Sequence, residues 1–383
     1  MTETWLDGAA VAARLGVKAQ TLYAYVSRGR IQARPDPDDP RRSLYSAQDI
    51  ARLEARKARG RRAADVAQDA IAWGEPVLSS AITDVSGGFL RYRGQNAVAL
   101  AETKGLEDVA LLLWGCNDPS AFVRGPRPRV RMRGLAPARA FAAMAARAGA
   151  DSPALGRSAA TLWREGAGLV ADLSAALGDG GGEDAAHMSL ARAWDLGPAE
   201  ADLLRRALVL LADHELNAST FAARVAASTG ASLAACVLAG LAALSGPRHG
   251  GAGARVAALI DDAGRLGPQA AVEGWIARGE PLAGFGHALY PDGDPRAGAL
   301  MAAFTSPPEL MALKSRAEEV TGLHANVDFA LAAMTRTFGL PADAPFALFA
   351  LGRSVGWIAH ALEQLQTGGL IRPRARYVGP APR

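Results

Sequence analysis

Hydrophobic and small residues recur at helical spacing along most of this 383-residue chain, and few segments show the apolar-polar alternation of half-buried strands. Half of the residues are apolar, and alanine-rich runs such as 142–148 and 239–243 add high helix propensity. The pattern therefore predicts a largely helical protein.

The stretch from Leu211 to Gly251 combines this apolar pattern with a histidine near each end, His214 and His249. A Ser-Thr-Gly break at 228–230 interrupts the stretch, which therefore predicts two close-packed helices rather than one. Each histidine then lies at a helix end, where an imidazole can meet a ligand. A lone histidine at such a place more often packs or caps, so this position alone does not identify a site.

The positive charge of the chain is concentrated at its N-terminus. The formal net charge is +4, and residues 1–62 alone hold 13 lysine and arginine residues against 7 aspartate and glutamate residues. A basic appendage on a nearly neutral body is typical of nucleic-acid binding.

The same region has the pattern of a helix-turn-helix followed by a wing. Residues 5–29 predict two short helices around a turn, and 41–45 predict a basic strand. Ser46 is placed to cap a further helix over 47–59. Residues 63–77 are then expected to form a linker to the body.

This order, with the sequence YSAQDIARL at 45–53, resembles the DNA-binding domain of MerR-like regulators and excisionases. The resemblance implies a winged helix-turn-helix over residues 1–62. The side chains that it directs to the major groove are Gln20, Thr21, Tyr23 and Arg28, and those that it directs to phosphates are Arg41 and Arg42. A helical protein-docking module would show the same pattern and stays open as the alternative.

The cysteines and the apolar runs predict a soluble, cytoplasmic protein. Cys116 and Cys236 lie in apolar surroundings without a CxxC or Cys/His cluster, so both are expected to be reduced core thiols. Residues 1–7 carry acidic side chains and no apolar segment follows them, which argues against a signal peptide. The uncharged run 225–247 is long enough for a membrane span, but its Ser, Thr and Gly content favours a buried helix pair.

The helical body is expected to begin near residue 76 and to be interrupted at three places. Residues 87–94 predict a short extended turn, and 117–135 and 178–183 predict loops. Neither glycine group precedes a helix in a βαβ context, so no phosphate-binding role is assigned to these glycines.

Two further polar clusters interrupt apolar sequence in the C-terminal part of the body. Residues 284–297 read GFGHALYPDGDPRA, and 326–329 read NVDF. Glycine adjoins both His287 and His249, so the backbone can approach a ligand closely there. Asp328 has an apolar residue on each side, and burial among apolar groups raises the pKa of a carboxylate toward that of a useful base.

Two histidines and a carboxylate on separate turns suit the removal of a proton next to a carbonyl. The α-proton of a thioester is a much weaker acid than a carboxylic acid, so a hydrogen-bond donor must also stabilise the developing enolate oxygen. Arg296, Arg353 and Arg372 offer planar forks for the carboxylates of a di- or tricarboxylic acid.

From about residue 78 to the C-terminus, the chain resembles citrate synthase. The motifs that carry the resemblance occur in the family's order: DHELNASTFAARV, GPRHGG, GFGHALYPDGDPRA, NVDF, FALGRSVGWIAHALEQ and IRPRARYVGP. The resemblance implies that Asp328 removes a methyl proton from acetyl-CoA, that His249 stabilises the enol, and that His287 polarises and protonates the ketone of oxaloacetate. It also implies that oxaloacetate is bound by His214, His287, Arg296, Arg353 and Arg372 of the partner subunit.

The resemblance further implies an all-α homodimer. Its large domain would span 78–249 and 335–383, and its small domain, 250–334, would close on the substrates. No cofactor or metal is implied, since acetyl-CoA is a substrate, and the need to neutralise phosphates suggests Lys314 and Arg374 as CoA contacts. Residues 113–211 match the family poorly, and the N-terminal region lies outside the usual family plan.

Three residues near these motifs carry no catalytic expectation. His360 is interpreted as a packed helical histidine, His324 as a surface residue and Trp357 as part of the core.

Two alternative functions stay open. The first is a 2-methylcitrate synthase that uses propionyl-CoA, because one methylene in an acyl pocket is worth only about 1 to 3 kcal/mol. The second is a DNA-binding regulator that keeps the synthase fold as a sensor of CoA esters or oxaloacetate.

Overall fold

The computed structural model describes residues 5–15, 22, 26, 31–37, 39, 42–51, 78–123, 133–178, 180, 185–375 and 377–380. The chain divides into two units, Met1–Ser79 and Ser80–Arg383. Each unit has a hydrophobic core of its own.

In the N-terminal unit a three-stranded antiparallel sheet accompanies one helix. The strands are β1 (Trp5–Asp7), β2 (Ala33–Pro35) and β3 (Ser43–Ser46), in the order β1-β3-β2, and α1 spans Gly8–Leu15. The Asp7 carboxylate accepts a hydrogen bond from the backbone N–H of Ala10 at 2.9 Å, which stabilises the start of α1. The core side chains are Val11, Leu15, Leu22, Ile31, Tyr45 and Ile50.

This sheet corrects part of the helix-turn-helix prediction. Residues 5–7, predicted to open the first helix, form β1 instead because they pair with residues 44–46 of β3. The predicted cap is confirmed, since the backbone N–H of Asp49 donates to Ser46 Oγ at 3.4 Å and residues 47–51 are helical. A helix-turn-helix is not established, and the predicted contact residues Gln20, Thr21, Tyr23, Arg28 and Arg41 lie outside the described residues.

The second unit, the body, is mostly helical. Its described helices are α4 (Ala97–Thr103), α5 (Leu106–Trp114), the 3-10 helix η1 (Pro119–Phe122), α6 (Ala136–Ala150), α7 (Ala159–Leu177), α8 (Ala186–Ala193), α9 (Pro198–Leu211), α10 (Ala218–Ser228), α11 (Leu233–Leu244), α12 (Ala252–Leu266), α13 (Pro268–Ala277), α14 (Pro295–Ala302), α15 (Pro308–Thr321), α16 (Val327–Thr337) and α17 (Ala344–Thr367).

A small antiparallel sheet precedes these helices, so the prediction of an all-α fold is wrong in this detail. Its strands are β4 (Thr83–Ser86), β5 (Phe89–Tyr92) and β6 (Gln95–Asn96). Positive φ at Gly87 and Gly88, and again at Arg93 and Gly94, makes the two tight turns that join them. The segment 87–94, predicted as a short extended turn, is therefore one strand with its flanking turns.

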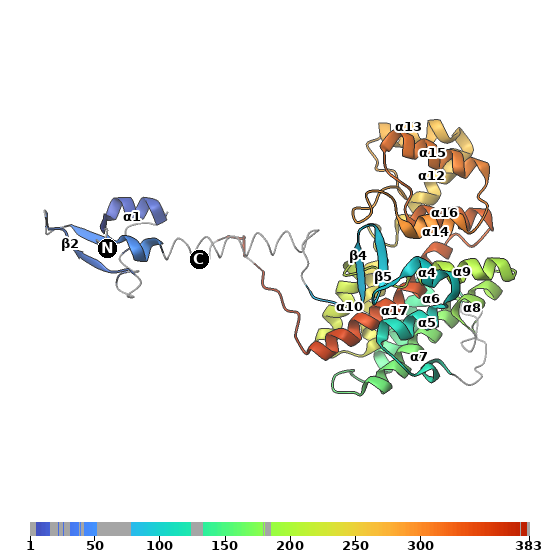
Figure 1. Cartoon of the computed structure of the whole chain (residues 1–383), viewed down its shortest axis with the longest axis horizontal. Coiled ribbons are helices and arrows are strands. Elements are labelled where there is room, and N and C mark those ends of the chain that lie inside the picture. The colour runs from blue at the N-terminus through green and yellow to red at the C-terminus, as the bar shows by residue number, and fades with distance from the viewer. Residues whose placement is uncertain are drawn as a thin grey trace. The chain divides into compact units, whose positions relative to one another are not determined.

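Helix α17 runs through the larger group of helices (Figure 1) and packs against α5, α6, α7, α9, α10 and α11. Residues 347–362 of this helix are buried without a break. A helix that is buried all round has no solvent face for its polar side chains. Arg353 and His360 on α17 must therefore find their hydrogen-bond partners inside the protein.

The stretch 211–251 forms two helices that pack against each other, α10 and α11, as predicted. The side chains of Asn217 and Ser232 accept hydrogen bonds from the first turns of these helices. Gly240 on α11 allows close contact with Trp357, because an added Cβ would lie 2.7 Å from the indole ring. Trp357 is fully buried, which confirms its interpretation as a core residue.

A second hydrophobic cluster gathers side chains of α12, α13, α15 and α16. Figure 1 shows α12, α13 and α15 grouped on one side of the body, with α14 and α16 between them and the larger helix group. The cluster includes Val256, Trp275, Leu313 and Phe329. These residues fall within 250–334, and the closure of that segment as a domain stays a prediction.

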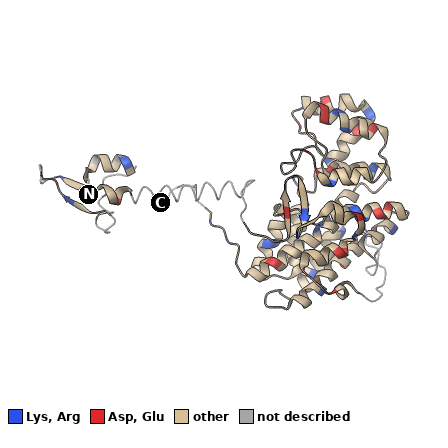
Figure 2. Cartoon of the chain, in the orientation of Figure 1, with Lys and Arg blue, Asp and Glu red and all other residues tan. Residues whose placement is uncertain are grey.

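Charged residues of both signs are interspersed over the body helices (Figure 2). Cys116 and Cys236 are free and buried, as predicted. None of the helices in the described parts of the chain has both the length and the hydropathy to cross a bilayer.

Candidate active site

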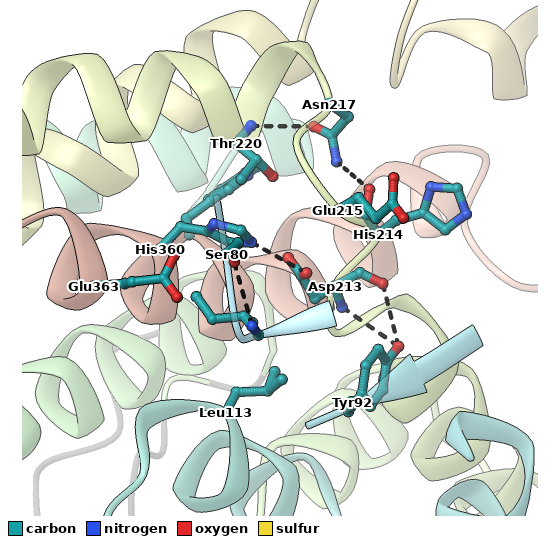
Figure 3. Close-up of polar contacts among 12 residues, drawn as sticks. Ser80, Tyr92, Leu113, Asp213, His214, Glu215, Asn217, Thr220, His360 and Glu363 are labelled. Atoms are coloured by element: carbon teal, nitrogen blue, oxygen red, sulfur yellow. Dashed lines mark hydrogen bonds and ion pairs between the residues drawn. The ribbon is translucent and has the colours of Figure 1, made fainter. Parts of the chain in front are cut away.

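The connection from α9 to α10 carries His214 and is held by the β4–β5 hairpin (Figure 3). The hydroxyl of Tyr92 on β5 bonds the carbonyl oxygen of Asp213 at 3.3 Å. Glu215 has a φ of 52°, and its carboxylate accepts a hydrogen bond from the backbone N–H of Val85 on β4 at 2.9 Å. The hairpin therefore fixes the backbone on both sides of His214.

Two histidines from separate motifs meet at this connection. His214 Nε2 lies 2.9 Å from the hydroxyl of Tyr290. The ring centroids of His214 and His287 are 5.1 Å apart with an interplanar angle of 81°, and Tyr290 lies 5.0 Å from His287 by the same measure. The structure thus brings His214 and His287 together around a tyrosine.

The hydrogen bonding of His287 identifies the proton-bearing atom of its ring. Its Nδ1 accepts a hydrogen bond from the backbone N–H of Leu289 at 3.2 Å. Burial, followed by the charge of Arg296, lowers the pKa of His287 to about 4, so the ring is neutral at pH 7. A neutral ring that accepts at Nδ1 carries its proton on Nε2. His287 can therefore donate a hydrogen bond through Nε2.

His249 lies between α11 and α12 and contacts a serine of α10. Its Nε2 is 2.9 Å from Ser219 Oγ, which also lies 2.7 Å from the side-chain oxygen of Asn217 and 3.2 Å from Trp357 Nε1. Burial, followed by the charge of Arg353, lowers the pKa of His249 to about 4. This imidazole is also neutral at pH 7, and its orientation is fixed from one side.

Asn326 joins the loop that carries His287 to the helix that carries Asp328. Its backbone N–H donates to the carbonyl of Gly284 at 2.8 Å, and its side-chain amide donates to the carbonyl of Gly286 at 3.0 Å. Its side-chain oxygen accepts a hydrogen bond from the backbone N–H of Asp328 at 3.0 Å and so caps α16. Hydrogen bonds from the backbone and side chain of Asn326 therefore hold the two segments that carry the predicted catalytic groups together.

Asp328 is half-buried in the first turn of α16. Within the described residues, no hydrogen bond is donated to its carboxylate. Burial raises the pKa of Asp328 to about 6, although the charge of Arg296 opposes this rise. At pH 7 the group is ionised and is a stronger base than a surface aspartate.

Two arginines are buried beside these groups. Arg296 is held by the carboxylate of Asp294, with Nε to Oδ1 at 3.0 Å and Nη2 to Oδ2 at 2.8 Å. Arg353 donates through Nε to the carbonyl of Leu211 at 2.9 Å and forms no ion pair with a described carboxylate. Burial lowers the pKa of Arg353, but an arginine stays charged even so. Arg353 therefore has guanidinium N–H groups that a carboxylate of an anionic ligand can bind.

The electrostatic effects place these side chains in one cluster. The charges of Arg296 and Arg353 both lower the pKa of His214, which burial lowers first and most. The same two charges act on Asp328, and that of Arg353 acts on His249. The groups predicted from five separate motifs therefore share one buried environment.

Other predicted residues lie apart from this cluster. Arg372 and Arg374 are exposed in the segment after α17, and neither forms a hydrogen bond or an ion pair with a described residue. Lys314 lies on α15 and pairs with Glu318 at 2.8 Å. His324 is exposed, as expected. Of the six residues predicted to contact DNA, only Arg42 is described, and it is exposed.

Sequence reasoning missed several residues that shape the cluster. Tyr290 and Asp294 stand inside the same motif as His287, and the order Asp-Pro-Arg at 294–296 is a recognisable helix start that points to Asp294 as a cap. Ser219 and the partners of His360 carry no comparable sequence signal. His360 is buried in α17, as interpreted, but it also hydrogen-bonds Asp213.

The arrangement suits proton removal next to a carbonyl. Asp328 supplies a base, His287 supplies a neutral donor, His249 supplies a second neutral imidazole, and the buried arginines supply sites for carboxylates. A carboxylic acid with a ketone could bind at the arginines while a second substrate presents its proton to Asp328.

Comparisons with known proteins agree with this chemistry. A profile of the family described as "Citrate synthase, C-terminal domain" matches residues 131–374. The chain is 41% identical over 189 residues to putative citrate synthase 2 of Mycobacterium tuberculosis, covering 46% of this chain and 50% of that protein. It is 36% identical over 187 residues to 2-methylcitrate synthase of Shewanella oneidensis, covering 46% of this chain and 50% of that protein. The chain thus spans about half the length of the curated relatives it matches.

A solved structure matches a larger share of the chain. Citrate synthase of Thermoplasma acidophilum, in a ternary complex with carboxymethyl coenzyme A and oxaloacetate, is 27% identical with a TM-score of 0.65. The match covers 80% of this chain and 95% of that one.

Proposed function

Because this chain belongs to the citrate synthase family, we propose that it condenses acetyl-CoA with oxaloacetate and releases citrate and CoA. One observation carries the proposal: a half-buried carboxylate, Asp328, has a pKa of about 6 and is affected by the charges of the same two buried arginines as His214. A base of this strength beside neutral donors is what removal of a proton from a thioester requires.

In the first proposed step, Asp328 takes a proton from the methyl group of acetyl-CoA. The electron pair of the C–H bond forms the C=C bond of the enolate, and negative charge moves to the thioester oxygen. His249 donates a hydrogen bond to that oxygen through Nδ1, while its Nε2 accepts one from the hydroxyl of Ser219. Relative to an ordinary aspartate, the raised pKa narrows the mismatch with the carbon acid by about 2 units, or about 3 kcal/mol.

In the second step, the nucleophilic carbon of the enolate attacks the ketone carbon of oxaloacetate and a C–C bond forms, while the enolate oxygen becomes the thioester carbonyl again. His287 donates through Nε2 to the ketone oxygen, which ends as the hydroxyl of citryl-CoA. Asp328 returns its proton to the imidazole by way of water. His287 suits this role because its Nδ1 is occupied by the N–H of Leu289 and its ring is neutral.

In the last step, water adds to the thioester carbonyl of citryl-CoA. The C–S bond breaks, CoA leaves as the thiol, and citrate remains. Release of a free thiol is therefore the product signal of the full reaction.

The arginines and His214 are proposed to bind oxaloacetate. Arg353 has no carboxylate partner among the described residues, so a substrate carboxylate can pair with its free guanidinium nitrogens. One edge of the Arg296 guanidinium is bound by Asp294, which orients its remaining N–H groups.

The chain is proposed to act as a homodimer with a closing small domain, 250–334. Arg372 of the partner subunit would complete the oxaloacetate site. The exposure of Arg372, which has no hydrogen bond or ion pair with a described residue, supports this assignment. Lys314 and Arg374 are proposed to neutralise phosphates of CoA.

The alternative acyl substrate is propionyl-CoA, which would make the enzyme a 2-methylcitrate synthase. The 36% identity to the Shewanella oneidensis protein of that name supports it. The two substrates differ by one methylene, and a pocket separates such substrates by about 1 to 3 kcal/mol.

We propose DNA binding as a second function, located in the N-terminal unit. Residues 1–62 support DNA binding by their charge, with 13 basic residues against 7 acidic ones. Arg34, in strand β2, and Arg42, just before strand β3, are both exposed. The winged helix-turn-helix form of this unit is part of the proposal. Mobility shift at low salt should detect binding that deletion of residues 1–62 removes, and unchanged mobility of all DNA tested would favour a protein-docking module.

Release of free CoA thiol tests the enzymatic proposal. Acetyl-CoA and propionyl-CoA are each incubated with the full chain, with and without oxaloacetate. Thiol release that depends on oxaloacetate is expected, and the faster acyl-CoA identifies the synthase. A folded protein that releases thiol from neither would leave the fold as a metabolite sensor.

A further inference from the structure

A buried carboxylate lies directly behind the proposed oxaloacetate site. Asp213, the residue before His214, is 0% exposed, and its Oδ1 has no hydrogen-bond partner in the described parts of the chain. Its Oδ2 lies 3.3 Å from Nε2 of His360 on α17 (Figure 3). A buried charge with so few partners depends strongly on each one that it has.

The protonation of His360 follows from its other contact. Its Nδ1 faces Nη1 of Arg224 at 3.2 Å, and a guanidinium nitrogen can only donate. Nδ1 must therefore carry the lone pair, which leaves the proton of the neutral ring on Nε2. His360 consequently donates to Asp213 and accepts from Arg224.

Arg224 is itself fixed from two further sides. Its Nη1 donates to Glu363 Oε2 at 2.6 Å, and its Nε donates to Gln364 Oε1 at 3.0 Å. Glu363 and Gln364 follow His360 by one turn of α17, so a single helix holds the guanidinium and the imidazole in register. The result is an ordered chain from Glu363 through Arg224 and His360 to Asp213.

The position of Asp213 is confined by packing as well as by hydrogen bonds. An added Cβ on Gly356 of α17 would lie 2.3 Å from Asp213 Oδ1, so the carboxylate occupies the space that a side chain would need. The Tyr92 hydroxyl donates a hydrogen bond to the backbone carbonyl of Asp213. Among the neighbouring charges that raise the pKa of Arg353, the negative charge of Asp213 has the largest effect. Asp213 thus connects α17, through His360 and Gly356, to the backbone that carries His214.

We infer that His360 is a positioning residue for oxaloacetate binding: by donating through Nε2 to Asp213, it fixes the backbone that presents His214 and the counter-charge behind Arg353. His360 does not touch the substrate. The inference rests on the proposed function, because its effect is read as affinity for oxaloacetate. It also replaces the earlier interpretation of His360 as a residue that only packs.

Two substitutions separate the two hydrogen bonds of His360. His360→Gln places an amide N–H where Nε2 stands and so keeps a donor for Asp213. His360→Asn places its polar atoms near Nδ1, so it keeps a contact for Arg224 but does not reach Asp213. The variants are similar in polarity and differ in the one contact on which the inference depends. His187→Asn, on α8 and outside the network, is the matched control.

We expect His360→Asn to raise the dissociation constant for oxaloacetate about tenfold, the lower end for loss of a hydrogen bond to a buried charge. The KM for acetyl-CoA should change less than about twofold, because His249 and Asp328 are held by other contacts. His360→Gln should stay within about threefold of the wild type for both ligands. Binding is measured by calorimetry at a temperature where thermal unfolding shows every variant folded.

Equal oxaloacetate affinity in His360→Asn, His187→Asn and the wild type would overturn the inference. So would equal losses in His360→Asn and His360→Gln, since these would indicate packing alone. Failure of the proposed function gives a different result, in which the wild type neither binds oxaloacetate nor releases thiol. In that case, nitrogen NMR of His360 still tests the structural step, which requires a neutral ring protonated at Nε2.

Discussion

Asp294 and Arg296 form a buried pair with two parallel hydrogen bonds, and their side chains are 1% and 3% exposed. Oδ2 of the same carboxylate accepts a hydrogen bond from the backbone N–H of Val327 at 3.0 Å. Val327 precedes Asp328 at the start of α16. One carboxylate therefore fixes both the guanidinium proposed to bind a substrate carboxylate and the helix that carries the proposed base.

Asp294→Asn should destabilise the body by about 3 to 5 kcal/mol, because it leaves the buried charge of Arg296 without its partner. Chemical denaturation measures this change in the free energy of unfolding. Glu319→Gln is the control, since Glu319 pairs with Arg316 at the surface with 71% of its side chain exposed. It should cost less than about 1 kcal/mol. Equal effects of the two substitutions would contradict the structural role given to Asp294.

Ser219→Ala should reduce kcat about tenfold while leaving the KM for oxaloacetate nearly unchanged, because it removes the group that orients His249. Ser219 Oγ has one proton and three polar neighbours, His249, Asn217 and Trp357. Steady-state kinetics measures the effect, with Ser228→Ala on the same helix as control, since its hydroxyl bonds only the carbonyl of Val225 among the described residues. A rise in the KM for oxaloacetate with unchanged kcat would place Ser219 in binding instead.

The reaction should slow in acid as the proposed base is protonated. Burial raises the pKa of Asp328 to about 6, so kcat/KM for the acyl-CoA should fall tenfold per pH unit below that value. His249 and His287, with pKa values of about 4, stay neutral through this range and do not contribute. Initial rates from pH 5 to 8 test the prediction, and a profile that is flat down to pH 5 would contradict it.

Because its pKa is raised in the folded state, Asp328 should lower the free energy of unfolding at neutral pH. The folded state holds its proton up to about pH 6, whereas the unfolded chain releases it near the ordinary value of 3.8. Asp328 therefore does not lower the free energy of unfolding below pH 3.8, the pKa in the unfolded chain. It lowers that free energy as the pH rises from there through about 6, the pKa in the folded state. Asp328→Asn should be more stable than the wild type by about 1 to 2 kcal/mol at pH 8, with the difference vanishing near pH 4. A stability difference that does not depend on pH would count against a buried, ionised Asp328.

The helical body and the polar groups within it were predictable from local sequence. The break at 228–230 correctly predicted α10 and α11, and the polar clusters at 284–297 and 326–329 supplied His287 and Asp328. Such signals are local, because each consists of a polar or glycine residue in an otherwise apolar run. Their roles in catalysis stay proposals.

What could not be predicted depends on contacts between segments distant in sequence. Tyr92 and Asp213 are separated by 121 residues, and Asp213 and His360 by 147. No pattern near His360 distinguishes a packed histidine from one that holds a carboxylate. Strand β1 was missed for the same reason, since three residues beside a helix become a strand only through their pairing with β3.

The most direct test of the central claim compares the full chain with Asp328→Asn. Free CoA thiol is measured with an acyl-CoA and oxaloacetate, and oxaloacetate affinity is measured in parallel on the same preparations. We expect the wild type to turn over, whereas Asp328→Asn should lose turnover by at least about a thousandfold and keep its oxaloacetate affinity within about threefold. Thiol release by Asp328→Asn at the wild-type rate, or an equal loss of turnover and affinity, would contradict the assignment of Asp328 as the base.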